Sequence, residues 1–128
     1  MKKQIIATDQ APSAIGPYSQ ALKIEAGGML FCSGQIALDP VSMELVGEDA
    51  AAQTHQILKN LAAVLKQAGL GLENVVKATV YLTNMTDFVK VNEVYAEYFT
   101  EIRPARAAVG VASLPKNALV EIEAIACY

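Results

Sequence analysis

An arginine and a pair of glutamates near the C-terminus are the residues of this 128-residue chain best suited to chemistry. Arg106 follows a proline and precedes a run of small residues, so its planar guanidinium could hold a carboxylate with open space around it. The alternative is a structural ion pair with a glutamate. Glu121 and Glu123 stand two positions apart in a predicted strand, so their side chains point to the same side of it.

The glutamate pair has two interpretations. In the simpler one, both carboxylates belong to a solvated strand edge. In the other, one of them lies in a cleft at a subunit interface, where removal from water favours its use as a general base. The sequence leaves both open.

Two turns and one helical position add weaker candidates. Gly16-Pro17-Tyr18 places an aromatic hydroxyl at the mouth of a rigid turn. Ser33-Gly34-Gln35 ends a strand with a hydroxyl and a glycine whose amide is accessible. Asn92 is either a site residue or a plain surface residue. Each is weak evidence alone, because turns and surfaces are rich in such residues.

Several classes of site are disfavoured. His55 is the only histidine, which argues against metal–histidine clusters and Ser-His-Asp triads. No Gly-x-Gly-x-x-Gly or P-loop motif is present, so we expect no nucleotide cofactor and no metal. Cys32 and Cys127 match no metal-ligand spacing and are expected to be reduced thiols, with a disulfide or reactive thiol as the alternative. A net charge of −3 argues against nucleic-acid binding as the main role.

The length predicts a single domain over residues 1–128. The apolar stretch after Met1-Lys2-Lys3 is far too short for a secretory signal. No window approaches the roughly 18 apolar residues of a membrane span. We therefore expect a cytoplasmic protein that does not enter the membrane.

The elements that must position these residues follow from periodicity and turn signals. Strands are expected at Gln4–Thr8, Ser19–Glu25, Met29–Gln35, Val75–Leu82, Ala107–Ala112 and Leu119–Ala126, the second and third forming a hairpin around Gly27-Gly28. A helix over Ala50–Ala68 is predicted, with Asp49 as N-cap and Gly69 beyond its end, and another over about Thr86–Thr100.

This order predicts an α+β fold, a mixed sheet with both helices packed on one face. Met29–Cys32 and Val75-Val76 offer apolar side chains to both faces of that sheet, and two helices cover only one of them. Since an apolar face left in water favours aggregation, we expect a homo-oligomer.

Six segments resemble those of the Rid (reactive intermediate deaminase) family, most closely its RidA group, in the same order. They are Ala14–Gln20, Cys32–Ile36, Val91–Tyr95, Pro104–Arg106, Leu114–Lys116 and Val120–Ala126. The match runs from residue 4 to the C-terminus.

The resemblance implies a chorismate-mutase-like fold assembled as a homotrimer, with three active sites in clefts between subunits. Arg106 would hold a substrate carboxylate, helped by the backbone of Gly34. Glu121 would position and activate the attacking water from the same pocket as Arg106. Tyr18, Ser33 and Asn92 would line the cleft.

The implied reaction is hydrolysis of 2-imino acids, such as 2-iminobutanoate and 2-iminopropanoate, to 2-keto acids and ammonia, without a cofactor. Three features depart from the family pattern. Many relatives have a cysteine where this chain has Ala108, a residue that would contact the substrate through its backbone. Many also have a glutamate where this chain has Gly110. The connection over residues 101–104 is also shorter than usual.

Other functions remain open. The same clefts could bind a 2-keto acid without catalysis, in which case Arg106 is needed and Glu121 is not. Ribonuclease or translation-inhibitor activity, as in some relatives, is disfavoured by the acidic balance. A chaperone-like activity is a third alternative.

Overall fold

The computed structural model describes residues 1–128. Its strands and longer helices are β1 (Lys2–Ile6), β2 (Ala21–Glu25), β3 (Met29–Gln35), α1 (Ala50–Gln67), β4 (Val75–Leu82), α2 (Phe88–Tyr98), β5 (Ala105–Gly110) and β6 (Val120–Cys127). Single 3-10 turns at Leu72–Asn74, Met85–Asp87 and Pro115–Asn117 precede β4, α2 and β6.

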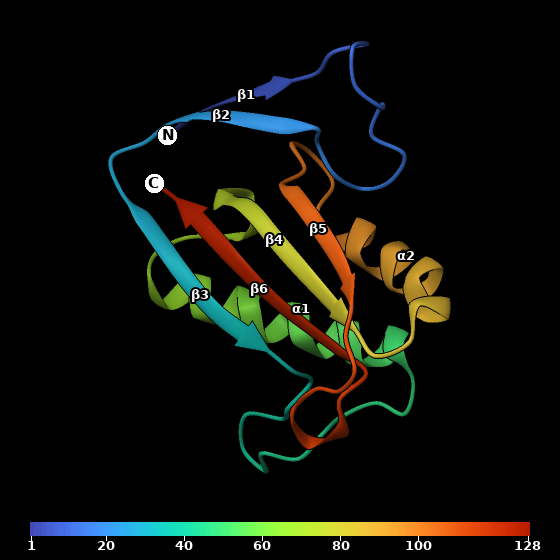
Figure 1. Ribbon diagram of the computed structural model, residues 1–128. Helices are drawn as coiled ribbons and strands as arrows, with labels where there is room; N and C mark the ends of the chain where they lie inside the picture. The colour runs from blue at the N-terminus through green and yellow to red at the C-terminus, as the bar shows by residue number, and fades with distance from the viewer.

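The main sheet has four strands in the order β3-β6-β4-β5. Strands β4 and β5 are parallel, because α2 carries the chain back between them, and the other pairs are antiparallel. Both helices pack on one face of this sheet (Figure 1). The predicted α+β class, with a mixed sheet and two helices on one face, is confirmed.

Helix α1 begins and ends as its sequence predicts. The Asp49 carboxylate accepts a hydrogen bond from the amide of Ala52 at 2.8 Å and so caps the first turn. At the other end Gly69 has φ +73, and the amides of Gly69 and Leu70 donate to the carbonyls of Lys66 and Leu65. This is a Schellman ending, which satisfies the last carbonyls of the helix.

Gly69→Ala should lower the free energy of unfolding by about 1 kcal/mol, since an L-residue is strained in the left-handed region. A Cβ at Gly69 would meet nothing within 4 Å, so the backbone alone causes the effect. Urea denaturation would measure it. Gly27→Ala is the control, because Gly27 has no positive φ and room for a methyl group; equal losses for both variants would contradict the argument.

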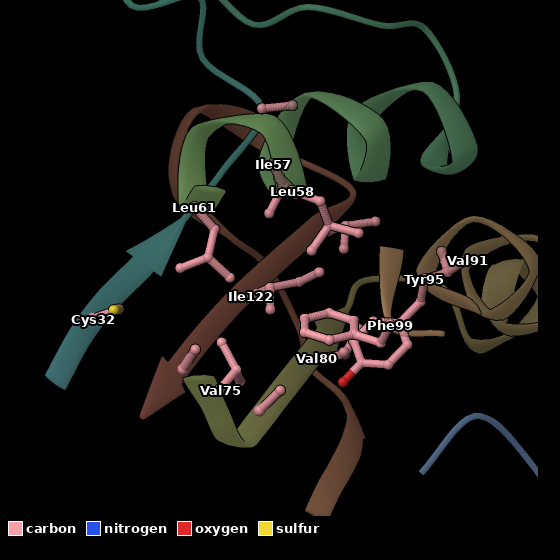
Figure 2. Close-up of a cluster of buried hydrophobic side chains, with 14 of the residues drawn as sticks. Cys32, Ile57, Leu58, Leu61, Val75, Val80, Val91, Tyr95, Phe99 and Ile122 are labelled. Carbon is pink, nitrogen blue, oxygen red and sulfur yellow. The ribbon is translucent and has the colours of Figure 1, made fainter. Parts of the chain in front are cut away.

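The core lies between the helices and the sheet (Figure 2). From α1 it takes Ile57, Leu58, Leu61 and Leu65, all fully buried, whereas Val64 of the same helix is 43% exposed. From α2 it takes Val91 and Tyr95, and Phe99 follows directly after the helix; the spacing of four residues puts all three on one helix face. From β4 and β6 these side chains meet Val75 and, beyond the irregularity that follows it, the even-numbered residues Ala78, Val80, Leu82, Val120, Ile122 and Ala124.

No element covers the opposite face of the main sheet, which we call the open face (Figure 1). Met29 and Phe31 of β3 are 54% and 71% exposed there. A hollow of about 330 Å³ on this face is lined by Phe31, Cys32, Ser33, Lys77, Thr79, Glu123, Ala124 and Ile125. The expectation of apolar residues on both faces is thus met on β3.

The predicted hairpin around Gly27-Gly28 is wrong. Strand β2 pairs antiparallel with β1, with Leu22 opposite Ile5, and this two-stranded ribbon lies apart from the main sheet. The amides of Gly27 and Gly28 both donate to the carbonyl of Tyr128. The two glycines therefore bind the chain end that follows β6, and the strand after them, β3, pairs with β6 instead of β2.

Other boundaries differ by only a few residues. Strand β5 begins at Ala105 rather than Ala107, so Arg106 lies inside the strand. Helix α2 is shorter than predicted, because residues 85–87 form a 3-10 turn capped by Asn84. Both cysteines are buried and unpaired, in line with reduced thiols. Neither helix has the length and apolarity needed to cross a bilayer.

Candidate functional site

Arg106 lies on β5, at the edge of the main sheet. In the parallel pairing it stands opposite Ala78, a buried residue of β4 whose side chain faces the helices. Paired residues point to the same face, so the Arg106 side chain also lies on the helix side. There it meets α2.

Four side chains hold the guanidinium of Arg106. Nη1 donates a hydrogen bond to Oδ1 of Asn92 at 2.7 Å. The Arg106 Cζ atom lies 4.8 Å from the ring centre of Tyr95, 5.5 Å from that of Tyr18 and 5.6 Å from that of Phe88. No carboxylate lies within ion-pair distance, so the structural ion pair proposed as the alternative for Arg106 is not formed within the chain.

The Tyr18 turn is tied to the beginning of β5. The Ser19 hydroxyl donates to the carbonyl of Arg103 at 2.6 Å, and the Ser19 amide to that of Pro104 at 3.3 Å. The Tyr18 hydroxyl accepts from the amide of Ile15 at 3.3 Å. Gly16 lies beside the guanidinium, since a Cβ there would be 3.7 Å from Nη2 of Arg106. The turn therefore forms one wall of the Arg106 site.

The charge of Arg106 is only partly compensated. Burial lowers the pKa of Arg106, and Tyr95 and Tyr18 act in the opposite direction. An arginine keeps its proton in proteins even so. The aromatic faces stabilise a cation without neutralising it, which leaves a half-buried positive charge able to attract an anion.

Ala108 and Gly110 follow Arg106 along β5. Ala108 stands opposite Val80, so it lies on the same helix side as Arg106, half-buried against the core. Gly110 is exposed at the end of the strand, where a Cβ would lie 3.1 Å from Cγ of Met85. A larger residue at position 110 would have to displace Met85.

The remaining predicted residues gather at β3 and β6. The register of this pair shifts between Cys32 and Gln35, so Ser33 and Gly34 form a bulge beside Glu123. Glu121 lies next to this bulge, and any Cβ at Gly34 would collide with its Oε1 atom. Glycine at 34 thus lets the Glu121 carboxylate approach the β3 backbone.

Gly34→Ala should therefore displace the Glu121 carboxylate. If Glu121 is the general base that the family resemblance implies, this displacement should lower the rate of imine hydrolysis by roughly 10²-fold, the low end of what a general base contributes. The fold should persist, because the colliding atoms belong to a flexible side chain. Activity and melting temperature measured together would check this, with Gly27→Ala as the matched control. Full activity in Gly34→Ala would show that the position of Glu121 is unimportant.

Within one chain Glu121 and Arg106 point to opposite faces of the sheet. Glu121 pairs with Tyr81, three positions along β4 from Ala78, the partner of Arg106. Tyr81 faces the open side, where its hydroxyl donates to Glu123 at 2.8 Å. Glu121 and Glu123 therefore share the open face, as predicted. A pocket containing both Arg106 and Glu121 requires more than one copy of the chain.

The structure also adds two residues that the sequence had not marked as candidates for the site. Phe88 and Tyr95 flank Arg106 from α2. Together with Asn92 they stand at i, i+4 and i+7, one face of a helix. That spacing, read from Asn92 outward, is the signal that could have identified them.

Comparison with known proteins gives the family. A family model described as endoribonuclease L-PSP matches residues 8–128. The chain belongs to this family, which includes the Rid proteins. The chain is 56% identical to a RutC family protein of Pyrococcus horikoshii, covering 97% of each chain. It is 50% identical to 2-iminobutanoate/2-iminopropanoate deaminase of Mus musculus, covering 97% of this chain and 90% of that one. A Rid family structure from Yersinia pestis, 33% identical, superposes over both whole chains with a TM-score of 0.89.

Proposed function

We propose that this protein hydrolyses 2-imino acids, including 2-iminobutanoate and 2-iminopropanoate, to 2-keto acids and ammonia. The observation that carries the proposal is Arg106, a half-buried guanidinium without a carboxylate partner. Asn92 takes one of its five N–H groups and leaves four for an incoming ligand. A substrate carboxylate supplies the missing charge and can accept two parallel hydrogen bonds.

The relatives support the choice of substrate. Those from mouse and human are named 2-iminobutanoate/2-iminopropanoate deaminase, and one from Arabidopsis thaliana is named Reactive Intermediate Deaminase A. Each of these three matches covers at least 97% of this chain. Others, from two Pyrococcus species, carry a RutC family name that states no substrate.

The complete site, in this proposal, is built between copies of the chain in a homotrimer. The Glu121 carboxylate on the open face of one copy meets the Arg106 pocket of its neighbour. The exposed Met29 and Phe31 support the assembly, because their burial against another copy would remove apolar surface from water. Ser33, Gly34 and Glu121 would then come from one copy, and Tyr18, Asn92, Arg106 and Ala108 from the other.

The reaction begins with the substrate carboxylate bound to Arg106, which fixes the imine carbon beside a water held by Glu121. The water oxygen attacks C2 while Glu121 takes one of the water protons, and the π electrons of the C=N bond move to the nitrogen. Glu121 gives this proton to the nitrogen, which completes the carbinolamine. Glu121 then carries the hydroxyl proton of the carbinolamine to the nitrogen as the C–N bond breaks, so that the 2-keto acid and ammonia are released. Because imines hydrolyse unaided, positioning and one general base suffice, the base contributing about 10²- to 10⁴-fold.

A trapping assay tests the proposal. A threonine dehydratase generates 2-iminobutanoate, and semicarbazide traps the free imine as a semicarbazone. Adding the protein should lower the rate of semicarbazone formation in proportion to its concentration. An unchanged rate at equimolar protein and dehydratase would exclude the activity. Binding of 2-oxobutanoate with no such effect would instead indicate a non-catalytic 2-keto acid module.

The ribonuclease in the family's name is the competing function. His55, the only histidine, contacts the Tyr98 hydroxyl through Nδ1 at 3.2 Å and Glu97 through Nε2 at 3.8 Å. It is thus engaged between α1 and α2. Incubation with single-stranded RNA, beside an Arg106→Ala and a Glu121→Gln sample prepared identically, would reveal cleavage that belongs to this site.

A further inference from the structure

The guanidinium of Arg106 rests on a stack of rings that reaches into the core. Tyr95 is the nearest ring, with its centre 4.8 Å from Cζ, while Tyr18 and Phe88 are more distant and only half-buried. On its other side the Tyr95 ring meets Phe99 at 4.5 Å between centres, with 33° between the planes. Figure 2 shows the two rings side by side at the edge of the hydrophobic cluster.

Tyr95 differs from the other groups around Arg106 in being completely buried. Its side chain is 0% exposed, and Phe99 is 4% exposed. Close packing confines such side chains to single rotamers. The Tyr18 ring belongs to a loop, and Asn92 is half-buried. Tyr95 is therefore the contact through which the close-packed core can fix the orientation of the Arg106 guanidinium.

The hydroxyl of Tyr95 takes no part in this contact. It is buried and makes no hydrogen bond to any protein group. Burial raises the pKa of Tyr95, although the positive charges of Arg106 and Arg103 act in the opposite direction. The hydroxyl thus keeps its proton, and Tyr95 attracts Arg106 through the face of its ring rather than through a phenolate charge.

We propose that Tyr95 is a positioning residue for Arg106, and that it acts through its ring alone. The ring, held in place by Phe99, keeps the guanidinium in the orientation that leaves its free N–H groups directed at a carboxylate. A carboxylate partner could hold Arg106 equally firmly, but it would compete with the substrate. An aromatic ring orients the cation and leaves the charge available. This inference deepens the proposed function and rests on it for the identity of the ligand.

Two measurements test the inference, one of which needs no ligand. The first is the Kd for 2-oxobutanoate, the stable product, by isothermal titration calorimetry. The second is the rate at which phenylglyoxal modifies Arg106, followed by peptide mass spectrometry. Arg103 is the only other arginine of the chain and serves as the internal reference.

Tyr95→Leu should raise the Kd roughly tenfold to thirtyfold, as expected for a desolvated cation–π contact. It should also speed modification of Arg106 relative to Arg103. Tyr95→Phe should leave both quantities within about twofold and keep or raise the melting temperature, because it removes an unpaired buried hydroxyl. Tyr98→Leu is the matched control: it removes a ring from the same helix that contacts His55 instead of Arg106.

Should Tyr95→Leu fail to fold, Phe99→Leu removes the support behind the same ring and should shift both quantities in the same direction. Wild-type Kd and wild-type Arg106 reactivity in a folded Tyr95→Leu or Phe99→Leu protein would overturn the inference. So would a Tyr95→Phe variant as impaired as Tyr95→Leu, which would assign the role to the hydroxyl. If the wild-type protein itself does not bind 2-oxobutanoate, the proposed function fails, and the labelling ratio still decides on Tyr95.

Discussion

Arg106→Lys should lower kcat/KM for 2-iminobutanoate by about 10²-fold, although the positive charge is retained. The lysine ammonium cannot donate two parallel hydrogen bonds to a carboxylate while a third goes to Asn92. Its compact charge also loses the contact of a planar cation with the Tyr95 ring. The trapping assay gives kcat/KM, and calorimetry with 2-oxobutanoate gives the binding part of the loss.

Arg103→Lys is the control for this variant. Arg103 stands just before β5, and its Nε donates to the carbonyl of Phe99 at 3.1 Å, a bond that a lysine can replace. We expect its kcat/KM to stay within about threefold of the wild-type value, as for a surface change. Equal losses at both positions would mean that the loss is not specific to the oriented fork of Arg106.

Glu121→Gln should lower kcat about 10²- to 10⁴-fold and leave the Kd for 2-oxobutanoate nearly unchanged. Glutamine has the shape of glutamate but does not accept a proton, so the ligand pocket persists while the base is lost. Glu123→Gln is the matched control on the same face, because its amide oxygen can still accept from Tyr81. A Glu121→Gln enzyme with normal kcat would remove the general base from the mechanism.

The placement of Arg106 and Glu121 on opposite faces allows a sharper experiment with the same residues. Chains carrying Arg106→Ala and chains carrying Glu121→Gln, with different affinity tags, can be co-expressed and the mixed assemblies purified through both tags. If each site takes its arginine and its glutamate from different copies, one site of every mixed trimer is intact. Such assemblies should show about one third of the wild-type activity. If one chain supplied both residues, mixing would restore nothing.

Strand pairing explains why the sequence could not assign these residues to faces. Arg106 and Glu121 both belong to late strands, and a linear sequence does not tell which strand each one pairs with. The parallel pairing of β4 with β5 sets Arg106 level with Ala78, and the antiparallel pairing with β6 sets Glu121 level with Tyr81. Ala78 and Tyr81 are three positions apart on β4, and successive residues of a strand point to opposite faces. Arg106 and Glu121, which stand beside them, therefore lie on opposite faces of the sheet.

The prediction of a hairpin around Gly27-Gly28 was wrong for a related reason. Two adjacent strands with a glycine pair between them favour a hairpin on local grounds. In the fold, however, β3 pairs with β6, and Met29 stands opposite Cys127. A central strand with two partners buries more of its backbone than a hairpin would, and local turn signals carry no information about such distant partners.

Local chemistry by itself determined much of this protein. Helix α1 was predictable to within one residue, because Asp49, Gly69 and the apolar periodicity all act within a few positions of the chain. The α+β class followed from the order of the strands and helices, and the candidate site residues followed from the resemblance of their segments to those of the Rid family. Only the tertiary structure placed the rings of Phe88 and Tyr95 around Arg106 and separated Arg106 from Glu121. Those relations depend on which strands pair and how α2 packs, and both are set by contacts between residues far apart in the chain.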